Sequence, residues 1–187
     1  MTVVRDGHLV LMFGPPGSGK STQGQLMAEA MGWNWISTGQ ILKQFGSDEL
    51  RGRLAKGALA TDDEVNALAD EAVKVKTAGG QTLVIDGYPR NAVQSERLLG
   101  VWPPVLAAIS MVVPDEEVIT RIKTRNRDDG DSVEATHKRI RIFNQNINPI
   151  RRTIELAGVP WIEVNGMASI EEVHDRVMAE IKNVLDK

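Results

Sequence analysis

One stretch of the chain combines glycines, a lysine and a serine in a spacing that suits phosphate binding. It reads Gly14-x-x-x-x-Gly19-Lys20-Ser21, a complete P-loop pattern, and an apolar run at 9–13 precedes it. Glycines let the backbone curl so that several N–H groups point at one phosphate chain, while the lysine adds a positive charge and the serine offers a hydroxyl to Mg²⁺. An ordinary surface turn is the alternative, and the helical sequence that follows disfavours it. The predicted triphosphate site consists of Gly14, Pro15, Pro16, Gly17, Ser18, Gly19, Lys20, Ser21 and Thr22.

A second polar segment, Asp-Gly-Tyr-Pro-Arg at 86–90, follows the apolar run at 82–85. A carboxylate at the end of a buried strand in a P-loop protein is placed to hold Mg²⁺ or its waters. The planar guanidinium of Arg90 suits a phosphate, because it can donate two parallel hydrogen bonds. We therefore predict that Asp86 and Ser21 serve a metal ion and that Arg90 binds a phosphate. Since Asp-Gly is also a common turn sequence, Asp86 acting only as a turn residue is the alternative.

Further arginines gather around one short charged segment at 126–131. They are Arg121, Arg125, Arg127 and Arg139. The first two are four residues apart and so share a helix face. Phosphoryl transfer depends on cations that offset the repulsion between two anions. We interpret the arginines as part of a phosphoryl-transfer site, and a solvated basic face is the alternative.

Apolar runs and helical patterns alternate along the chain, and these elements must position the side chains above. Short buried strands are expected at 9–13, 33–36, 82–85, 105–113 and 161–164. Helices are expected at 23–31, from 37, at 47–56, from 61 to about 78, at 91–99, from 114, at 132–156 and from 169. The helices from 61 and from 169 each begin with a capping-box pattern, Thr61 with Glu64 and Ser169 with Glu172. This alternation predicts an α/β protein with a P-loop NTPase fold: a five-stranded parallel β-sheet flanked by helices on both faces. Ligands bind beyond the carboxyl ends of such strands, where the candidate residues fall.

Composition limits the possible functions. The chain has 187 residues, 42% hydrophobic and 25% charged, which suits one soluble globular domain. The formal net charge of −3 disfavours broad nucleic-acid binding, which needs a basic face. The chain has no cysteine for disulfides or thiolate chemistry, and no apolar run is long enough to span a membrane. With no signal-peptide pattern before the first strand, we expect a cytoplasmic enzyme.

Together these motifs resemble those of adenylate kinases, within the nucleoside monophosphate kinase family. The resemblance covers essentially the whole chain, and its most specific piece is the segment 86–90 followed by Gln94. The other matching stretches are 14–20, 37–39, 57–59, the arginine set and 164–166. Longer members carry a lid insertion, sometimes with a zinc bound by cysteines, where this chain has only a shortened lid loop at 126–131. The chain therefore resembles the short, lidless type, and no zinc is expected.

The resemblance implies a role for each matching residue. ATP, the donor, would be bound by the P-loop together with Arg121 and Gly166, which would lie near its adenine. AMP, the acceptor, would be bound in and beside a monophosphate-binding segment at 37–66, by Thr38, Gly39, Lys43, Leu59, Gly87, Arg90 and Gln94. The transferred group would be surrounded by Lys20, Arg90, Arg125, Arg127 and Arg139. Simpler alternatives exist for Thr38 as a helix N-cap and for Gln94 as a capping-box partner of Asn91.

The chain departs from the family pattern at several positions. Ser21 replaces the usual glycine and restores the hydroxyl that P-loops in general place near Mg²⁺. Gln40 replaces an aspartate that would help order the waters of the metal. Lys43 replaces an arginine, which keeps the charge but loses the planar fork. The arginine set is spaced one residue more widely than expected, which leaves the family's acidic pair to be filled from Asp128, Asp129 and Asp131.

The function expected from these residues is reversible transfer of the γ-phosphoryl group from Mg·ATP to a nucleoside monophosphate, with AMP as the expected acceptor. A monomer is expected, because the short members of the family are usually monomeric. The alternatives are a kinase for UMP, CMP or a deoxynucleoside monophosphate, or a P-loop kinase of the shikimate or gluconate type. A non-catalytic nucleotide-binding switch is the remaining alternative.

Overall fold

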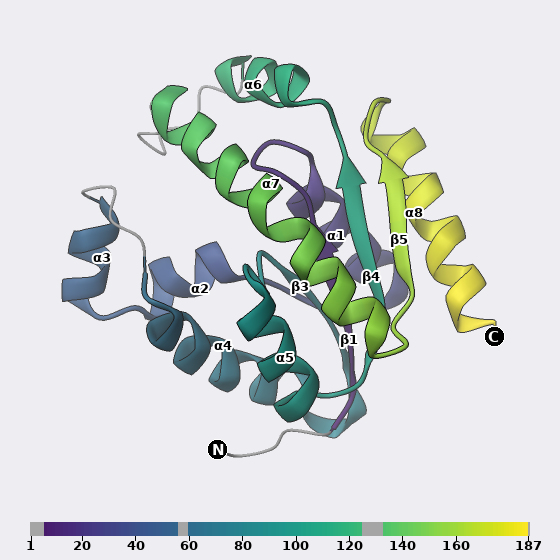
Figure 1. Ribbon diagram of the computed structural model, residues 1–187. Helices are drawn as coiled ribbons and strands as arrows, with labels where there is room; N and C mark the ends of the chain where they lie inside the picture. Colours follow the sequence, from purple (N-terminus) through teal and green to yellow (C-terminus); the bar gives the residue numbers. More distant parts are fainter. Residues whose placement is uncertain (1–5, 56–59, 125–132, 187) are drawn as a thin grey trace.

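Parallel strands form the central sheet of the computed structural model, which describes residues 6–55, 60–124 and 133–186 (Figure 1). The strands are β1 (His8–Phe13), β2 (Asn34–Ser37), β3 (Thr82–Asp86), β4 (Val105–Val112) and β5 (Trp161–Asn165). Their spatial order is β2-β3-β1-β4-β5, and every neighbouring pair is parallel. The predicted five-stranded parallel sheet is confirmed, with β1 at its centre.

Helices connect the strands and cover the sheet. They are α1 (Lys20–Met31), α2 (Thr38–Phe45), α3 (Asp48–Ala55), α4 (Asp62–Thr77), α5 (Ala92–Val101), α6 (Asp115–Thr124), α7 (Val133–Leu156) and α8 (Ile170–Leu185), with a 3₁₀ turn at Ala78–Gly80. Helices α4, α5 and α7 cover one face of the sheet, and α1 and α8 cover the other (Figure 1). None of these helices, in the part of the chain described, is both long and apolar enough to cross a membrane.

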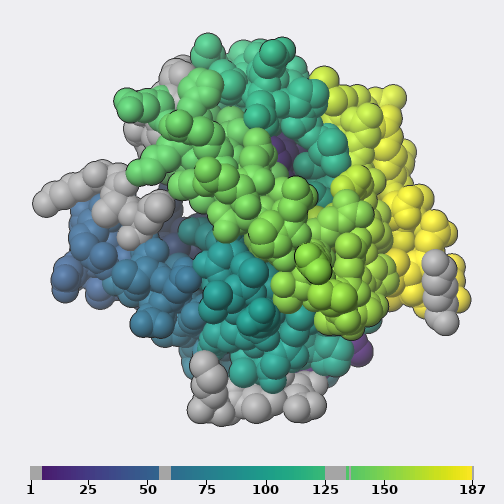
Figure 2. Space-filling model, viewed as in Figure 1, coloured from purple at the N-terminus to yellow at the C-terminus, as the bar shows by residue number. Residues whose placement is uncertain are grey.

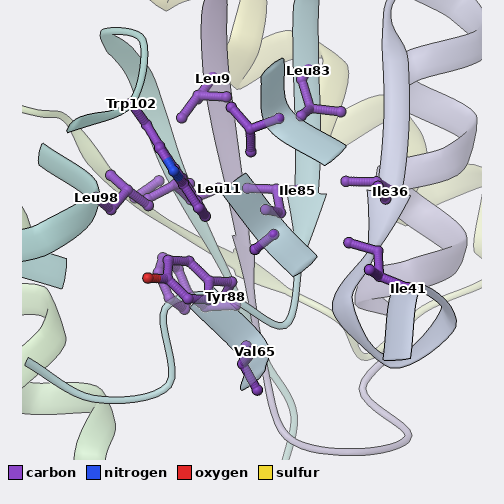
Figure 3. Packing of buried hydrophobic residues seen from close by; sticks show 14 of the residues in the cluster. Leu9, Leu11, Ile36, Ile41, Val65, Leu83, Ile85, Tyr88, Leu98 and Trp102 are labelled. Carbon is purple, nitrogen blue, oxygen red and sulfur yellow. The ribbon is translucent and has the colours of Figure 1, made fainter. Parts of the chain in front are cut away.

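Side chains of the central strand alternate between two hydrophobic cores, as the two-residue period of a strand requires. Leu9 and Leu11 are fully buried in the core under α4, α5 and α7, whereas Val10 and Met12 are fully buried in the core under α1 and α8. Figure 3 shows the first of these cores, where Leu9 and Leu11 lie among side chains of neighbouring strands and helices. Because β1 is buried on both faces, its position in the sheet is fixed. The place where the P-loop leaves the sheet is therefore fixed as well.

Capping boxes begin α4 and α8, as the sequence predicts. The Thr61 hydroxyl accepts a hydrogen bond from the Glu64 backbone at 3.3 Å, while the Glu64 carboxylate accepts one from the Thr61 backbone at 2.9 Å. Ser169 and Glu172 form the same reciprocal pair at the start of α8. Hydrogen bonds from the Thr61 and Ser169 backbones lower the pKa of Glu64 and Glu172 respectively. The first cap matters for the site, because it fixes where the first turn of α4 lies.

Candidate active site

The P-loop leaves the carboxyl end of β1 as a backbone turn that only glycine can form at its first position. Gly14 has a φ of 149°, and a Cβ added there would lie 2.4 Å from Ser18 Oγ. A side chain at this position would therefore be strained and would collide with the loop itself. Helix α1 begins at Lys20, rather than at the predicted residue 23, so the positive end of its dipole faces the loop. This geometry suits an anion held by backbone N–H groups.

Asp86, at the end of β3, lies beside the P-loop because β3 pairs with β1 in a register that places it opposite Met12. Its carboxylate is only 2% exposed, and Oδ2 accepts a hydrogen bond from the hydroxyl of Ser21. The other oxygen, Oδ1, is buried and has no hydrogen-bond partner among the described residues. A buried carboxylate oxygen without a partner is costly, and Mg²⁺ prefers oxygen ligands. The pair therefore fits the predicted role at a metal ion or its waters.

Arg90 is held in place by the loop that follows β3. Its Nε donates to the Gly87 carbonyl at 2.9 Å, and its Nη2 donates to Thr38 Oγ1 at 3.2 Å. The Thr38 hydroxyl in turn donates to the Gly87 carbonyl at 2.9 Å. Gly87 has a φ of 82°, and a Cβ there would lie 2.6 Å from Thr38 Oγ1, so glycine is needed for this close contact. The remaining N–H groups of the guanidinium are available to bind an anion.

Arg139, on α7, brings a second positive charge towards Arg90. Burial lowers the pKa of Arg90, Asp86 raises it, and the charge of Arg139 lowers it again. The Arg90 side chain is exposed, and its Nη2 is partly buried where it bonds to Thr38. The space-filling view shows the surface hollowed between the blue α2–α3 region and the green α7 (Figure 2). A phosphate bound by Arg90 would be stabilised further by the positive charge of Arg139.

Tyr88 anchors the loop that carries Arg90. Its side chain is fully buried, its hydroxyl donates to Asn66 Oδ1 at 2.7 Å, and its ring lies 4.6 Å from that of Trp102. Burial raises the pKa of Tyr88 to about 12, so the hydroxyl stays neutral at physiological pH. Figure 3 shows the tyrosine ring within the core beneath β3. Arg90 therefore directly follows a tightly packed, cis-linked Tyr88–Pro89 pair.

Gln94 is buried behind the same loop, 1% exposed. Its Oε1 accepts a hydrogen bond from the Arg90 backbone at 2.7 Å, and its Nε2 donates to Asp62 Oδ1 at 2.8 Å. Its own backbone N–H donates to Asn91 Oδ1, the N-cap of α5. The capping-box alternative is therefore only half right: Asn91 caps Gln94, but the Gln94 side chain does not return to the Asn91 backbone.

Helix α6 and the loop after β5 meet beside the P-loop. Arg121 Nη2 donates to the Gly166 carbonyl at 2.9 Å, and its Nε donates to Glu117 at 2.8 Å. A Cβ on Gly17 of the P-loop would lie 2.9 Å from Ile122. The structure thus brings together two residues that the resemblance assigned to the donor adenine, Arg121 and Gly166, next to the phosphate loop.

The predicted residues outside the P-loop that have not yet been placed divide into two groups. Gly39 is half-buried in the first turn of α2, and Lys43 is exposed in its last turn. Others lie outside the described residues: Leu59, Arg125, Arg127, the segment 126–131 and, within it, Asp128, Asp129 and Asp131.

Sequence analysis missed Asp62, which accepts hydrogen bonds from Gln94 and Asn91. It considered Asp62 only as part of the helix expected from 61. Asp62 is 32 positions from Gln94 in the sequence, so no local spacing reveals their hydrogen bond. The position of Thr38 also differs from its simpler interpretation. Ser37 is the N-cap of α2, without a side-chain cap bond, and the Thr38 hydroxyl bonds to Gly87 instead.

A P-loop, a neighbouring carboxylate and facing arginines, all at the carboxyl edge of a parallel sheet, define a P-loop phosphotransferase. The family model of adenylate kinases matches residues 12–157 of the chain. The protein belongs to the adenylate kinase family, and it is an enzyme that transfers phosphoryl groups.

Individual relatives agree with the family match along nearly the whole chain. The chain is 30% identical to the adenylate kinase of Thermus thermophilus over 188 residues, which cover 94% of this chain and 97% of the relative. It is 32% identical to the adenylate kinase of Thermobifida fusca over 189 residues, covering 93% and 98% of the two chains. It is 31% identical to that of Hyphomonas neptunium over 186 residues, covering 92% and 97%.

Proposed function

We propose that the protein catalyses reversible transfer of the γ-phosphoryl group from Mg·ATP to AMP, which yields two molecules of ADP. The observation that carries this proposal is the position of Arg90, held by Gly87 and Thr38 on the loop after β3, beside the Asp86 carboxylate that accepts from Ser21 of the P-loop. A P-loop alone requires only one nucleotide. A second, cationic phosphate site at the same sheet edge is what an acceptor phosphate needs. Membership of the adenylate kinase family, and relatives with that name, support AMP as the acceptor.

In this proposal the chain supplies position and charge rather than an acid or a base. The phosphate of AMP is already anionic at neutral pH, so no group has to remove a proton from it. Lys20 and the P-loop N–H groups hold the donor phosphates, and Arg90 holds the acceptor phosphate. Arg139, with Arg125 and Arg127, surrounds the group in transit and offsets the growing charge. Alignment of the two phosphates for in-line attack supplies much of the rate, because it replaces a bimolecular encounter.

Ser21 and Asp86 are the residues proposed to hold Mg²⁺ or its waters. When bound, the ion neutralises charge on the β- and γ-phosphates. Within the described part of the chain, no three His, Cys, Asp or Glu side chains come together as a metal cage. The two protein oxygens would therefore act together with the triphosphate, which is the usual arrangement for Mg²⁺. Gln40 stands where the family has an acid, so Asp86 is the carboxylate on which this arrangement rests.

We also propose that the whole chain forms one catalytic domain, that segment 37–66 binds the monophosphate, and that the enzyme works as a monomer in the cytoplasm. The resemblance to the short members of the family, which are usually monomeric, supports the monomer. The contacts Ser21 with Asp86, Thr38 with Arg90, and Arg121 with Gly166 join the site within a single copy of the chain. Light scattering of the purified protein, with and without nucleotides, tests the oligomeric state.

A panel of acceptors tests the reaction itself. Purified protein is assayed with Mg·ATP and AMP, UMP, CMP, dTMP, shikimate or gluconate, and kcat/KM is compared. We expect AMP to give the highest value, with two ADP formed per AMP consumed. Preference for another acceptor would overturn the assignment of AMP. Binding of ATP without any product from any acceptor would indicate a nucleotide-binding switch instead.

A further inference from the structure

We infer that Asp62 is a specificity-determining residue, which acts by fixing the orientation of the Gln94 amide so that the acceptor site distinguishes adenine from a base with a carbonyl at position 6. The inference rests on the proposed function, in which Gln94 contacts the acceptor base. Asp62 itself does not touch the base in this account. It is a positioning residue in the first turn of α4, and Gln94 lies on α5.

The contacts of Gln94 leave its amide a single orientation. Its Oε1 accepts from the Arg90 N–H at 2.7 Å, and its Nε2 donates to Asp62 Oδ1 at 2.8 Å. If the amide rotated by half a turn, two oxygen acceptors would face each other at Asp62. Two N–H donors would face each other at Arg90. Each of these mismatches leaves buried polar groups unpaired, and the Gln94 side chain is almost wholly buried.

A second chain of contacts holds the Asp62 carboxylate. Asn91 Nδ2 donates to Asp62 Oδ2 at 3.0 Å. Asn91 cannot reverse its own amide, because its Oδ1 accepts the Gln94 backbone N–H at 2.8 Å as the cap of α5. A carboxylate is the one side chain of this size that can accept from both Asn91 and Gln94 at once. The aspartate therefore completes a closed set of donors and acceptors.

A fixed amide matters because the bases differ in the order of their donors and acceptors. At its Watson–Crick edge, adenine offers an N–H donor at position 6 and an acceptor at N1. Hypoxanthine, the base of IMP, offers a carbonyl acceptor at position 6 and an N–H donor at N1. After its protein contacts, Gln94 keeps one N–H and one lone pair. An amide free to rotate could match either base, whereas a fixed amide matches only one order.

The simpler account is that Asp62 only stabilises the start of α4, where an acid counters the helix dipole. Asp63 provides the matched comparison, because it is exposed in the same helical turn and carries the same charge. The side chain of Asp63 has no hydrogen bond or ion pair with any of the described residues. Both aspartates would stabilise the helix dipole. Of the two, only Asp62 accepts a hydrogen bond from the Gln94 amide and can orient it.

The test compares kcat/KM for AMP with kcat/KM for IMP in Asp62→Asn and Asp63→Asn. In Asp62→Asn the Asn91 donor still requires an acceptor, so the new amide turns its N–H towards Gln94. Each orientation of Gln94 then leaves one pair of donors face to face, at position 62 or at the Arg90 backbone, and the glutamine amide is no longer fixed. We expect the AMP-to-IMP ratio to fall at least about tenfold, the size of one mispaired buried hydrogen bond. Asp63→Asn should keep the wild-type ratio. Loss of negative charge near Arg90 would change both substrates alike and leave the ratio unaltered.

Two further variants separate the possible outcomes. Asp62→Ala, which removes the acceptor without adding a donor, should lower the ratio less than Asp62→Asn. In a Gln94→Leu background, Asp62→Asn should leave the ratio unchanged, because its effect passes through the glutamine. A wild-type ratio in both Asp62 variants would overturn this inference while the AMP kinase activity stands. A wild-type protein that does not phosphorylate AMP would overturn the proposed function instead.

Discussion

The ends of β1 and β3 lie side by side, and they are built in different ways. After β1, the chain forms a backbone turn whose tightest position, Gly14, has no room for a side chain. After β3, only Gly87 is required by the backbone, and the rest depends on side chains that bond to one another across three helices. The first region depends on backbone N–H groups, which every residue except proline carries. The second depends on the chemical identity of each residue.

This difference predicts that the β1 region tolerates changes in its side chains better than the β3 region does. A backbone cradle binds phosphates without regard to the base they belong to. A set of bonded side chains can recognise one base, but each member fails if its partner is lost. We therefore expect that substitutions near β1 affect the donor, and that substitutions near β3 affect the acceptor.

The largest effect is expected from Arg90→Ala, which removes the side chain proposed to bind the acceptor phosphate in the β3 region. We expect kcat/KM for AMP to fall by about 100-fold or more, the scale seen when a positioned charge is removed from a transition state. Steady-state kinetics at saturating Mg·ATP provide the measurement. Arg152→Ala, an exposed arginine on α7, should behave like the wild type. An unchanged rate in Arg90→Ala would contradict the proposed acceptor site.

The second largest effect is expected at the boundary between the two regions, where the Ser21 hydroxyl donates a hydrogen bond to the Asp86 carboxylate. Asp86→Asn keeps the shape of the side chain but loses its charge, so we expect the Mg²⁺ concentration for half-maximal rate to rise by about 10–100-fold. Mg²⁺ titrations at fixed ATP and AMP measure this shift. Asp175→Asn, in an exposed position on α8, serves as the control. If the Mg²⁺ dependence did not change, Asp86 would be only a turn residue.

A matched pair of glycine variants compares the two regions directly. A Cβ on Gly14 would lie 2.4 Å from the Ser18 hydroxyl, and one on Gly87 would lie 2.6 Å from the Thr38 hydroxyl. We expect Gly14→Ala to raise the KM for ATP, and Gly87→Ala to raise the KM for AMP, each by about tenfold as one or two hydrogen bonds are displaced. If both variants raised the same KM, the division between the regions would be wrong.

The smallest effect is expected at the cap of α8, where the Ser169 and Glu172 side chains bond to each other and to neither region. Ser169→Ala removes one half of the capping box, so the free energy of unfolding should fall by about 1 kcal/mol while kcat/KM stays unchanged. Urea unfolding followed by circular dichroism measures the change. Because the folded pKa of Glu172 is lowered, its contribution is complete above its unfolded pKa and is lost as pH falls through the folded value. The difference between wild type and Ser169→Ala should therefore narrow in acid, and a difference that is constant with pH would contradict the reciprocal cap.

The two regions also differ in how far they could be predicted from sequence. The strand, P-loop and helix at the start of the chain were predicted nearly to the residue, because their residues act on neighbours a few positions away. Both capping boxes were predicted for the same reason. The contact of Arg121 with the Gly166 carbonyl could be expected only from the family resemblance, since the two residues are 45 positions apart.

The acceptor region could be predicted only in part. The presence of Thr38, Arg90 and Gln94 at the site followed from motifs, but the partners of their side chains did not. Hydroxyls and amides can satisfy their hydrogen bonds in several ways, and spacing alone does not choose among them. The choice is made by tertiary packing, which places the first turn of α4 against the first turn of α5 and brings Asp62 to Gln94.

The central position of β1 also affects how the protein is synthesised. It leaves the ribosome before the other described strands, yet its two neighbours are β3, which begins at Thr82, and β4, which ends at Val112. A nascent chain elongates at about 5–20 residues per second, so roughly 5–20 s separate the emergence of β1 from that of β4. Until that time the apolar residues of β1 lack at least one partner strand. A strand that is buried on both faces in the finished enzyme is therefore exposed to chaperones for several seconds during synthesis.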